Sequence, residues 1–266
     1  AGTAWELRTP SQVGGDIGTT SKCMALTETM VSTTSNLVGI FYDATATALE
    51  GWFYPEGGAW TQITDADFPP NIATAEPLCW GSGPAHMDGY AFWMTTNGKI
   101  WNSDMNSVSA YTASSYITDS SYPDGGVGIA RYKNLIVAFG TQSLSFYQNN
   151  GNATGSPLSI IGNATQRIGS VPSNAGVPYV RILPVGDTVY FIGKEASSGR
   201  FGIYRLNGYA AEKISNAYID KYINNSSLNV IHICGAFSMH GMTHVAFYIG
   251  AQTYNSNAIV NCFCID

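Results

Sequence analysis

Charged side chains are scarce in this sequence, and the positive ones are scattered. Asp, Glu, Lys and Arg make up 11% of the 266 residues, against roughly 25% in an average domain. The 12 lysines and arginines form no cluster, and the formal net charge is −6. A surface that grips DNA phosphates needs concentrated positive charge. The composition therefore argues against tight nucleic-acid binding, although it allows a wall past which DNA slides.

Long apolar runs and a disulfide framework are also missing. No apolar run reaches the about 18 residues of a membrane-spanning helix, so we expect no membrane partner. An odd, widely spaced set of five cysteines is a poor disulfide framework. We expect reduced, mostly buried thiols; the residues are Cys23, Cys79, Cys234, Cys262 and Cys264.

The motifs of common catalytic sites do not occur. The sequence has no G-x-S-x-G nucleophile elbow, no P-loop and no G-x-G-x-x-G. Carboxylates are available for acid–base chemistry, but nothing in their spacing pairs them, and Asp in loops mostly forms turns. We therefore expect neither an enzyme nor a cofactor. The carboxylates considered are Asp65, Asp67, Glu76, Asp88, Asp104, Asp119 and Asp124.

The sequence is rich in pairs of apolar strands separated by a polar break. In the segment 135–147, an apolar run from Leu135 to Phe139 precedes an alternating run from Leu144 to Tyr147. This is the signature of a β-hairpin. The same pattern predicts five hairpins, with breaks at 43–50, 95–98, 140–143, 193–200 and 250–257.

The hairpins recur at a regular interval. Their first strands begin at intervals of about 45 to 55 residues, the size of a propeller blade. A further apolar stretch precedes each hairpin, from residues 23, 77, 127, 179 and 230, and a short β-like stretch follows four of them: AWTQIT, SAYTAS, PLSII and AAEKIS. The pattern predicts an all-β protein, a β-propeller of four-stranded blades; a large β-sandwich is the alternative.

The domain boundaries follow from these units. We expect residues 1–22 to be an N-terminal arm or the edge of the first blade, and residues 23–266 to be a propeller domain of five blade-like units, the last incomplete. The start at Ala1 and the end at Asp266 suggest a piece of a longer chain. Apolar residues on one side of the segment 217–225 predict one short helix.

A metal site is an alternative in the last unit. His232 and Cys234 share a face of one strand, as do Cys262 and Cys264 on another, and neighbouring strands would bring four such ligands together for zinc. The segment HGMTH, with its two histidines at 240 and 244, lies between them. Cysteines that fill a blade core, with histidines in loops, explain the pattern more simply. We expect no metal.

A carbohydrate-binding propeller is the second alternative. Sugar sites place aromatic platforms beside a few polar groups. Trp60 and Trp101, in YPEGGAW and NGKIW, are the candidate platforms. Aromatic residues are also favoured in the core of half-buried strands. No Arg/Glu pair repeats between the units as a repeated sugar contact would require, so this function ranks second.

One segment resembles a known family. YPDGGVGIARYKNLIVAFGTQSLSFYQNNGNATGSPL, residues 122–158, is similar to the packaged-DNA stabilisation proteins of short-tailed phages, also described as tail nozzle or head-completion proteins. The pattern is Pro-Asp-Gly, an apolar strand, a hairpin with FGTQSLSFY, and a loop of small residues. It continues through RIGSV at 167–171, VGDTVYFIG and IYRLNGYAAEKIS. The good match covers 122–223, and its motifs are structural rather than catalytic.

The resemblance implies a structural virion protein of a phage tail. Such a protein forms a homo-oligomeric ring, a hexamer by resemblance, below the portal. It would contact portal or adaptor proteins and other tail proteins, retain the packaged DNA and line its exit channel without binding DNA specifically. The resemblance also implies assembly in the host cytoplasm.

Overall fold

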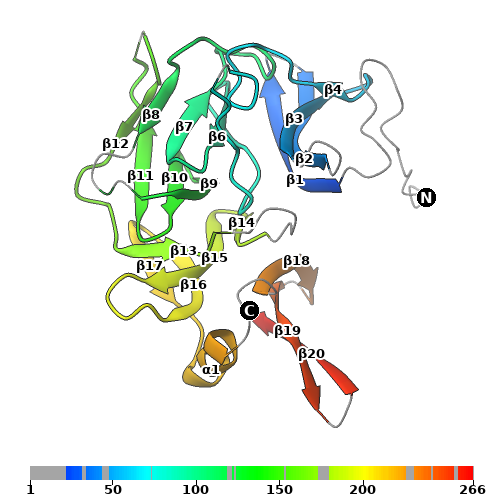
Figure 1. Ribbon diagram of the computed structural model, residues 1–266, viewed down its shortest axis with the longest axis vertical. Coiled ribbons are helices and arrows are strands. Elements are labelled where there is room, and N and C mark those ends of the chain that lie inside the picture. The colour runs from blue at the N-terminus through cyan, green and yellow to red at the C-terminus, as the bar shows by residue number, and fades with distance from the viewer. Residues whose placement is uncertain are drawn as a thin grey trace.

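The computed structural model describes residues 22–31, 34–43, 48–72, 74–118, 122, 124–152, 154–172, 180–225, 231–240, 242–254 and 257–265. Within these ranges the chain forms five antiparallel sheets and one helix (Figure 1). No helix in the described ranges is long and apolar enough to cross a lipid bilayer.

The first three sheets have four strands each, joined in chain order. The first sheet consists of β1 (Lys22–Val31), β2 (Thr34–Asp43), β3 (Ala48–Pro55) and β4 (Thr61–Gln62). The second consists of β5 (Ala85–Met87), β6 (Tyr90–Met94), β7 (Lys99–Asn102) and β8 (Tyr116–Thr118). The third consists of β9 (Gly126–Tyr132), β10 (Leu135–Gly140), β11 (Leu144–Asn149) and β12 (Leu158–Ile160).

The fourth sheet has five strands and the fifth has three. The fourth consists of β13 (Ile168–Ser170), β14 (Ile182–Val185), β15 (Thr188–Glu195), β16 (Phe201–Asn207) and β17 (Ala210–Lys213). β13 and β14 pair with different parts of β15, so two short strands take the place of one inner strand. The fifth consists of β18 (Ile231–Met239), β19 (Met242–Tyr254) and β20 (Asn257–Ile265), and α1 (Ala217–Asn225) precedes it.

All five predicted hairpins are confirmed. They are β2–β3, β6–β7, β10–β11, β15–β16 and β19–β20. The predicted helix is confirmed too, over 217–225. Asn216 begins it, because its side-chain oxygen accepts the backbone N–H groups of Tyr218 and Ile219, both at 3.0 Å. The buried side chain of Ile223 faces the sheets.

The inner strands of the five sheets meet around a common centre. β1 contacts β5, β5 contacts β9, β9 contacts β14, and β14 contacts β18. Figure 1 shows the sheets following one another around this centre, from the blue first sheet to the red fifth sheet. Antiparallel sheets that share a centre in chain order form a β-propeller, so the predicted fold class is confirmed.

The core lies between neighbouring sheets rather than inside any one sheet. A separate cluster of buried apolar side chains joins the first sheet to the second, the second to the third, the third to the fourth, and the fourth to the fifth. Phe139 and Phe191, from the third and fourth sheets, have ring centroids 5.0 Å apart. Each blade is therefore stabilised by burying its faces against its neighbours.

Two expected strands lie elsewhere. The stretch from residue 77 was expected to be the inner strand of the second unit, but that strand is β5, at 85–87. Leu78 and Cys79 are buried, yet Leu78 forms only an isolated bridge to Thr95, just after β6, and the Cys79 N–H donates to the carbonyl of Met94 at the end of β6. SAYTAS, at 109–114, was expected to be the outer strand, but β8 lies at 116–118. Tyr111 is buried from a loop, where its ring lies 4.9 Å from that of Phe68.

Candidate functional site

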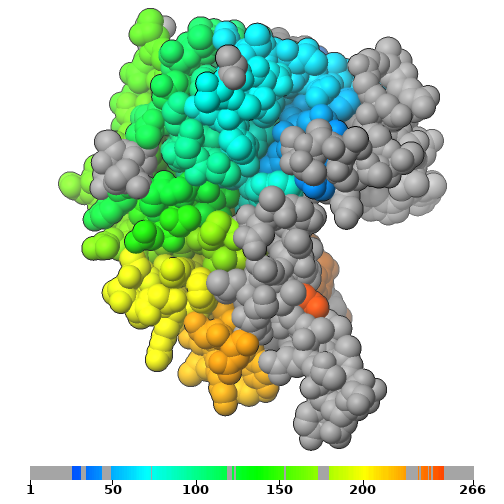
Figure 2. Space-filling view, in the orientation of Figure 1, coloured from blue at the N-terminus to red at the C-terminus, as the bar shows by residue number. Residues whose placement is uncertain are grey.

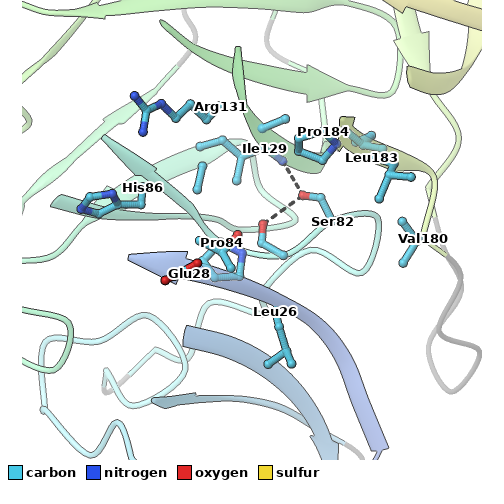
Figure 3. Close-up of a pocket in the computed structure, with 15 residues that line it drawn as sticks. Leu26, Glu28, Ser82, Pro84, His86, Ile129, Arg131, Val180, Leu183 and Pro184 are labelled. Atoms are coloured by element: carbon cyan, nitrogen blue, oxygen red, sulfur yellow. Dashed lines mark hydrogen bonds between the residues drawn. The ribbon is translucent and has the colours of Figure 1, made fainter. Parts of the chain in front are cut away.

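A hollow of about 310 Å³ lies where the inner strands of four sheets meet. Figure 3 shows its lining, from β1, from β5 and the segment before it, from β9, and from β14 and the segment before it. Most of the lining is apolar, with Leu26, Ile129 and Leu183 among the labelled side chains. The hollow is thus the axial space of the propeller.

Backbone hydrogen bonds close the sheets around this hollow. Gly81 donates its N–H to the carbonyl of Val127 at 3.1 Å, and its own carbonyl accepts the N–H groups of Arg181 at 3.0 Å and Ile182 at 3.2 Å. A Cβ at position 81 would lie 2.6 Å from the Val127 carbonyl oxygen. Glycine at 81 therefore lets the second, third and fourth sheets approach one another.

The hydroxyl of Ser82, which lines the hollow, makes hydrogen bonds to the backbone. Ser82 is 7% exposed. Its Oγ accepts the N–H of Ile129 at 2.7 Å and donates to the carbonyl of Gly83 at 3.2 Å, as the dashed lines in Figure 3 show. Both contacts hold neighbouring sheets or the local turn together. Ser82 therefore links the second and third sheets, and its hydroxyl, already bonded to the backbone, is poorly placed to act as a nucleophile.

Three ionisable side chains lie at the rim of the hollow, namely Glu28, His86 and Arg131 (Figure 3). Burial lowers the pKa of His86 from its ordinary value of 6.5, and the positive charge of Arg131 lowers it further, while Asp88 opposes the shift. His86 is therefore neutral at pH 7, and Arg131 supplies the positive charge of the rim.

The motifs of the 122–171 segment meet at a second place, which we call the turn junction: Asp124, the β10–β11 turn and Gly169. The Asp124 carboxylate accepts the backbone N–H groups of Gln142 and Ser143 and the Ser143 hydroxyl. A Cβ on Gly140 would lie 2.3 Å from the nearer carboxylate oxygen of Asp124, and one on Gly169 would lie 2.3 Å from the backbone of Thr141. Asp124 of the Pro-Asp-Gly motif, FGTQS and RIGSV therefore contact one another where the third and fourth sheets meet.

Several other carboxylates shape loops, as expected from their positions. Asp65 accepts the N–H groups of Asp67 at 2.8 Å and of Tyr111 at 3.2 Å. Asp104 accepts the hydroxyl of Thr112 at 2.8 Å. Asp119 lies outside the described residues. These contacts are those of turn-forming groups.

The two candidate sugar-binding tryptophans lie in different sheets. Trp101, on β7, is 3% exposed, and its indole N–H donates to Glu76 at 2.9 Å. Trp60, just before β4, is half-buried, with its ring 5.2 Å from that of Phe41. The structure does not bring the two rings together in one platform, and the buried face of Trp101 packs on Tyr116 at 4.8 Å.

The premise of the zinc alternative does not hold. β18 and β20 are not neighbours, because β19 lies between them and pairs with both. Strands two apart are separated by about 9.5 Å, too far for one tetrahedral zinc site. The side chains of the four proposed ligands lie outside the described part of the structure: His232, Cys234, Cys262 and Cys264.

The remaining metal candidates give no cluster in the described part of the chain. His244 is buried and stacks on Phe237, with centroids 5.4 Å apart, while His240 is exposed in a turn. Among the described residues, no three His, Cys, Asp or Glu side chains are grouped as a metal site would need. Cys79 is a free, buried thiol, and burial raises its pKa far above the ordinary value.

Comparison with solved structures finds distant likenesses. A putative exported protein from Bacteroides fragilis matches with a TM-score of 0.43 and 10% identity, over 91% of this chain and 71% of that one. BamB from Moraxella catarrhalis matches with a TM-score of 0.37 and 9% identity, over 92% of this chain and 76% of that one. Likeness at this level carries no argument about function. No curated protein matches the chain in sequence.

Comparison with family models gives the decisive match. Residues 2–244 match the family described as "Bacteriophage P22 Gp10, beta-propeller". The match covers most of the chain, including the first three inter-sheet clusters and the fourth up to Ile233. It agrees with the propeller seen here. It confirms the resemblance of the 122–223 segment and supports a structural phage protein that stabilises packaged DNA in the virion. The chain belongs to the bacteriophage P22 Gp10 β-propeller family.

Proposed function

We propose that this protein forms a homo-oligomeric ring, a hexamer by family resemblance, at the portal end of the phage head. The ring is a nozzle that retains packaged DNA and lines its exit channel. It contacts portal or adaptor proteins on one side and other tail proteins on the other, and it assembles in the host cytoplasm. The family match, which names a structural phage protein, supports this proposal.

The size of the axial hollow carries the argument for a ring. A space of 310 Å³ is about 8 Å across if spherical, whereas the major groove of B-DNA alone is about 12 Å wide. A hollow of this size does not admit duplex DNA, which supports a DNA path between several copies and not through one propeller. A channel for DNA requires several copies arranged around it, each presenting an outer surface to the path.

The net charge of the chain suits a channel wall that binds the passing DNA only weakly. The net charge is −6 and charged residues are few, so a channel wall made of this chain attracts phosphates weakly. Weak attraction lets DNA leave when the tail opens. Retention then depends on closing the channel, which is a mechanical task shared with neighbouring proteins.

The described side chains support a non-catalytic role. The hydroxyl of Ser82 in the axial hollow is used by the backbone, and burial together with the charge of Arg131 disfavours the protonated form of His86 at the rim. The family is one of structural phage proteins and not of enzymes. We propose that this chain turns over no substrate.

Loss of the protein tests this function. A phage in which the coding sequence is disrupted should package DNA into heads and then lose it, which nuclease-protection assays on purified heads would show. Resupplying the protein should restore protected DNA. Heads that retain their DNA without the protein, or heads that never fill, would contradict the proposal.

A further inference from the structure

A surface groove runs between the third and fourth sheets. Two hollows of about 640 and 470 Å³ share Lys133 and Asp187, and the first of them adjoins the axial hollow through Arg131 and Pro184. Lys133 lies in the two-residue turn between β9 and β10, and Asp187 in the turn between β14 and β15. Two tight turns from different blades thus form the walls of one groove.

Positive charge gathers in this groove, in contrast to the rest of the chain. Arg131, Lys133 and Arg205 come from β9, its following turn and β16, and all line the connected hollows. Arg131 and Lys133 are exposed. The Nε of Arg131 donates to the backbone carbonyl of Lys133 at 3.0 Å, and the Lys133 ammonium lies over the ring of Tyr132, 5.2 Å from its centroid. Arg205 is paired with Glu212 at 3.0 Å, so Arg131 and Lys133 are the main cations.

The groove favours a polypeptide over nucleic acid. The carboxylate of Asp187 lies in the groove with the cations. A DNA backbone presents acceptors and negative charge, which Asp187 repels. A protein segment supplies carboxylates for Arg131 and Lys133 together with N–H donors for Asp187. The chemistry of the groove therefore fits an acidic protein surface.

The chain itself carries a matching surface on another blade junction. Asp65, Asp67 and Asp104, which we call the acidic patch, lie on loops of the first and second sheets, and the charges of Asp65 and Asp104 both act on Tyr111. Met105 beside them is 63% exposed. Figure 2 shows the cyan surface that follows β4 at the top, and the green and yellow surfaces of the third and fourth sheets at the left and lower left. The groove lies on turns of the third and fourth sheets and the patch on loops of the first and second, so the two belong to different blade junctions.

We infer that the groove of one copy receives the acidic patch of the next copy, which gives a head-to-tail interface. An interface between two different surfaces of the same chain generates a ring when its rotation closes. The inference rests on the ring proposed above and identifies the surfaces that build it. Opposite charges across such an interface determine the orientation of neighbouring copies more than they determine how tightly the copies bind each other.

Charge reversal tests this interface. Lys133→Glu and Asp67→Lys should each weaken ring assembly by on the order of tenfold or more, measured by native mass spectrometry and analytical ultracentrifugation at low salt. Neither change removes the hydrogen bonds described above, because Lys133 and Asp67 contribute only backbone atoms to them. Lys221→Glu, the same charge change at an exposed position on α1, is the matched control and should leave assembly unchanged.

Restoration gives the sharpest outcome. The double variant Lys133→Glu with Asp67→Lys should assemble again, and a mixture of the two single variants should form mixed rings more readily than either variant assembles alone. A wild-type protein that forms no ring would refute the proposed function. Rings that survive both reversals would overturn only this interface. If Lys133→Glu abolishes binding to duplex DNA and leaves assembly intact, the groove binds nucleic acid and the inference is wrong.

Discussion

The turn junction predicts a specific non-additivity between Asp124 and Gly140. Asp124→Ala removes the acceptor for the N–H groups of Gln142 and Ser143 and for the Ser143 hydroxyl. Gly140→Ala places a Cβ 2.3 Å from one carboxylate oxygen and 2.5 Å from the other. Asp124→Ala therefore removes the hydrogen bonds that the carboxylate accepts, and Gly140→Ala forces the same carboxylate out of position.

The magnitudes follow from these contacts. Hydrogen bonds to a charged group contribute about 1.5–3 kcal/mol each when buried, and the half-exposed position of Asp124 reduces that value. We expect Asp124→Ala to lower the free energy of unfolding by about 3 kcal/mol and Gly140→Ala by about 2 kcal/mol. In the double variant the Asp124 carboxylate is absent, so the new Cβ at position 140 no longer clashes with it. Its loss should be about 3 kcal/mol and not the sum of about 5 kcal/mol.

Urea denaturation of the four proteins, followed by tryptophan fluorescence, measures this cycle. Gly162→Ala is the matched control, because Gly162, like Gly140, has no left-handed φ, and a Cβ built on it has no atom within 4 Å; it should leave the free energy of unfolding nearly unchanged. Losses for Asp124 and Gly140 that add within about 0.5 kcal/mol would refute the direct contact.

Four further outcomes follow from other sites. Glu76→Ala should destabilise the second sheet by about 2 kcal/mol in urea denaturation, because it leaves a partly buried ammonium and an indole N–H without their acceptor. Burial lowers the folded-state pKa of His86 below 6.5, so below that pH the unfolded chain binds more protons than the folded chain. The free energy of unfolding should therefore fall as the pH drops below 6.5. His86→Asn should flatten this part of the pH profile. The buried Cys79 should resist alkylation until the protein unfolds, and glycan arrays should show no selective binding that Trp60→Ala abolishes.

The sequence was sufficient for the hairpins because their apolar strands and polar breaks are local. It misplaced the inner strand of the second unit, since burial alone does not distinguish a strand from a loop packed between blades. Leu78 and Cys79 are as buried as strand residues. The short β5 offers only three residues, one of them the half-buried His86, and gives little periodic signal.

The proposed interface and the turn junction depend on geometry that no local pattern reveals. Lys133 and Asp187 are far apart in the chain, and the propeller brings their turns together. The turn junction is similar, because Asp124, Gly140 and Gly169 look like ordinary turn residues until the blades are assembled. The family motif signalled that these residues matter, but only the structure shows that they contact one another.

Cryo-electron microscopy of the virion that contains this chain tests the central claim most directly. The account predicts several copies in a closed ring at the portal end, with DNA passing between the copies and not through any single propeller, whose axial hollow is about 310 Å³. Neighbouring copies should meet through the groove at Lys133 and the patch at Asp67. A single copy at that position, DNA threaded through one propeller, or absence of the chain from the tail would contradict the account.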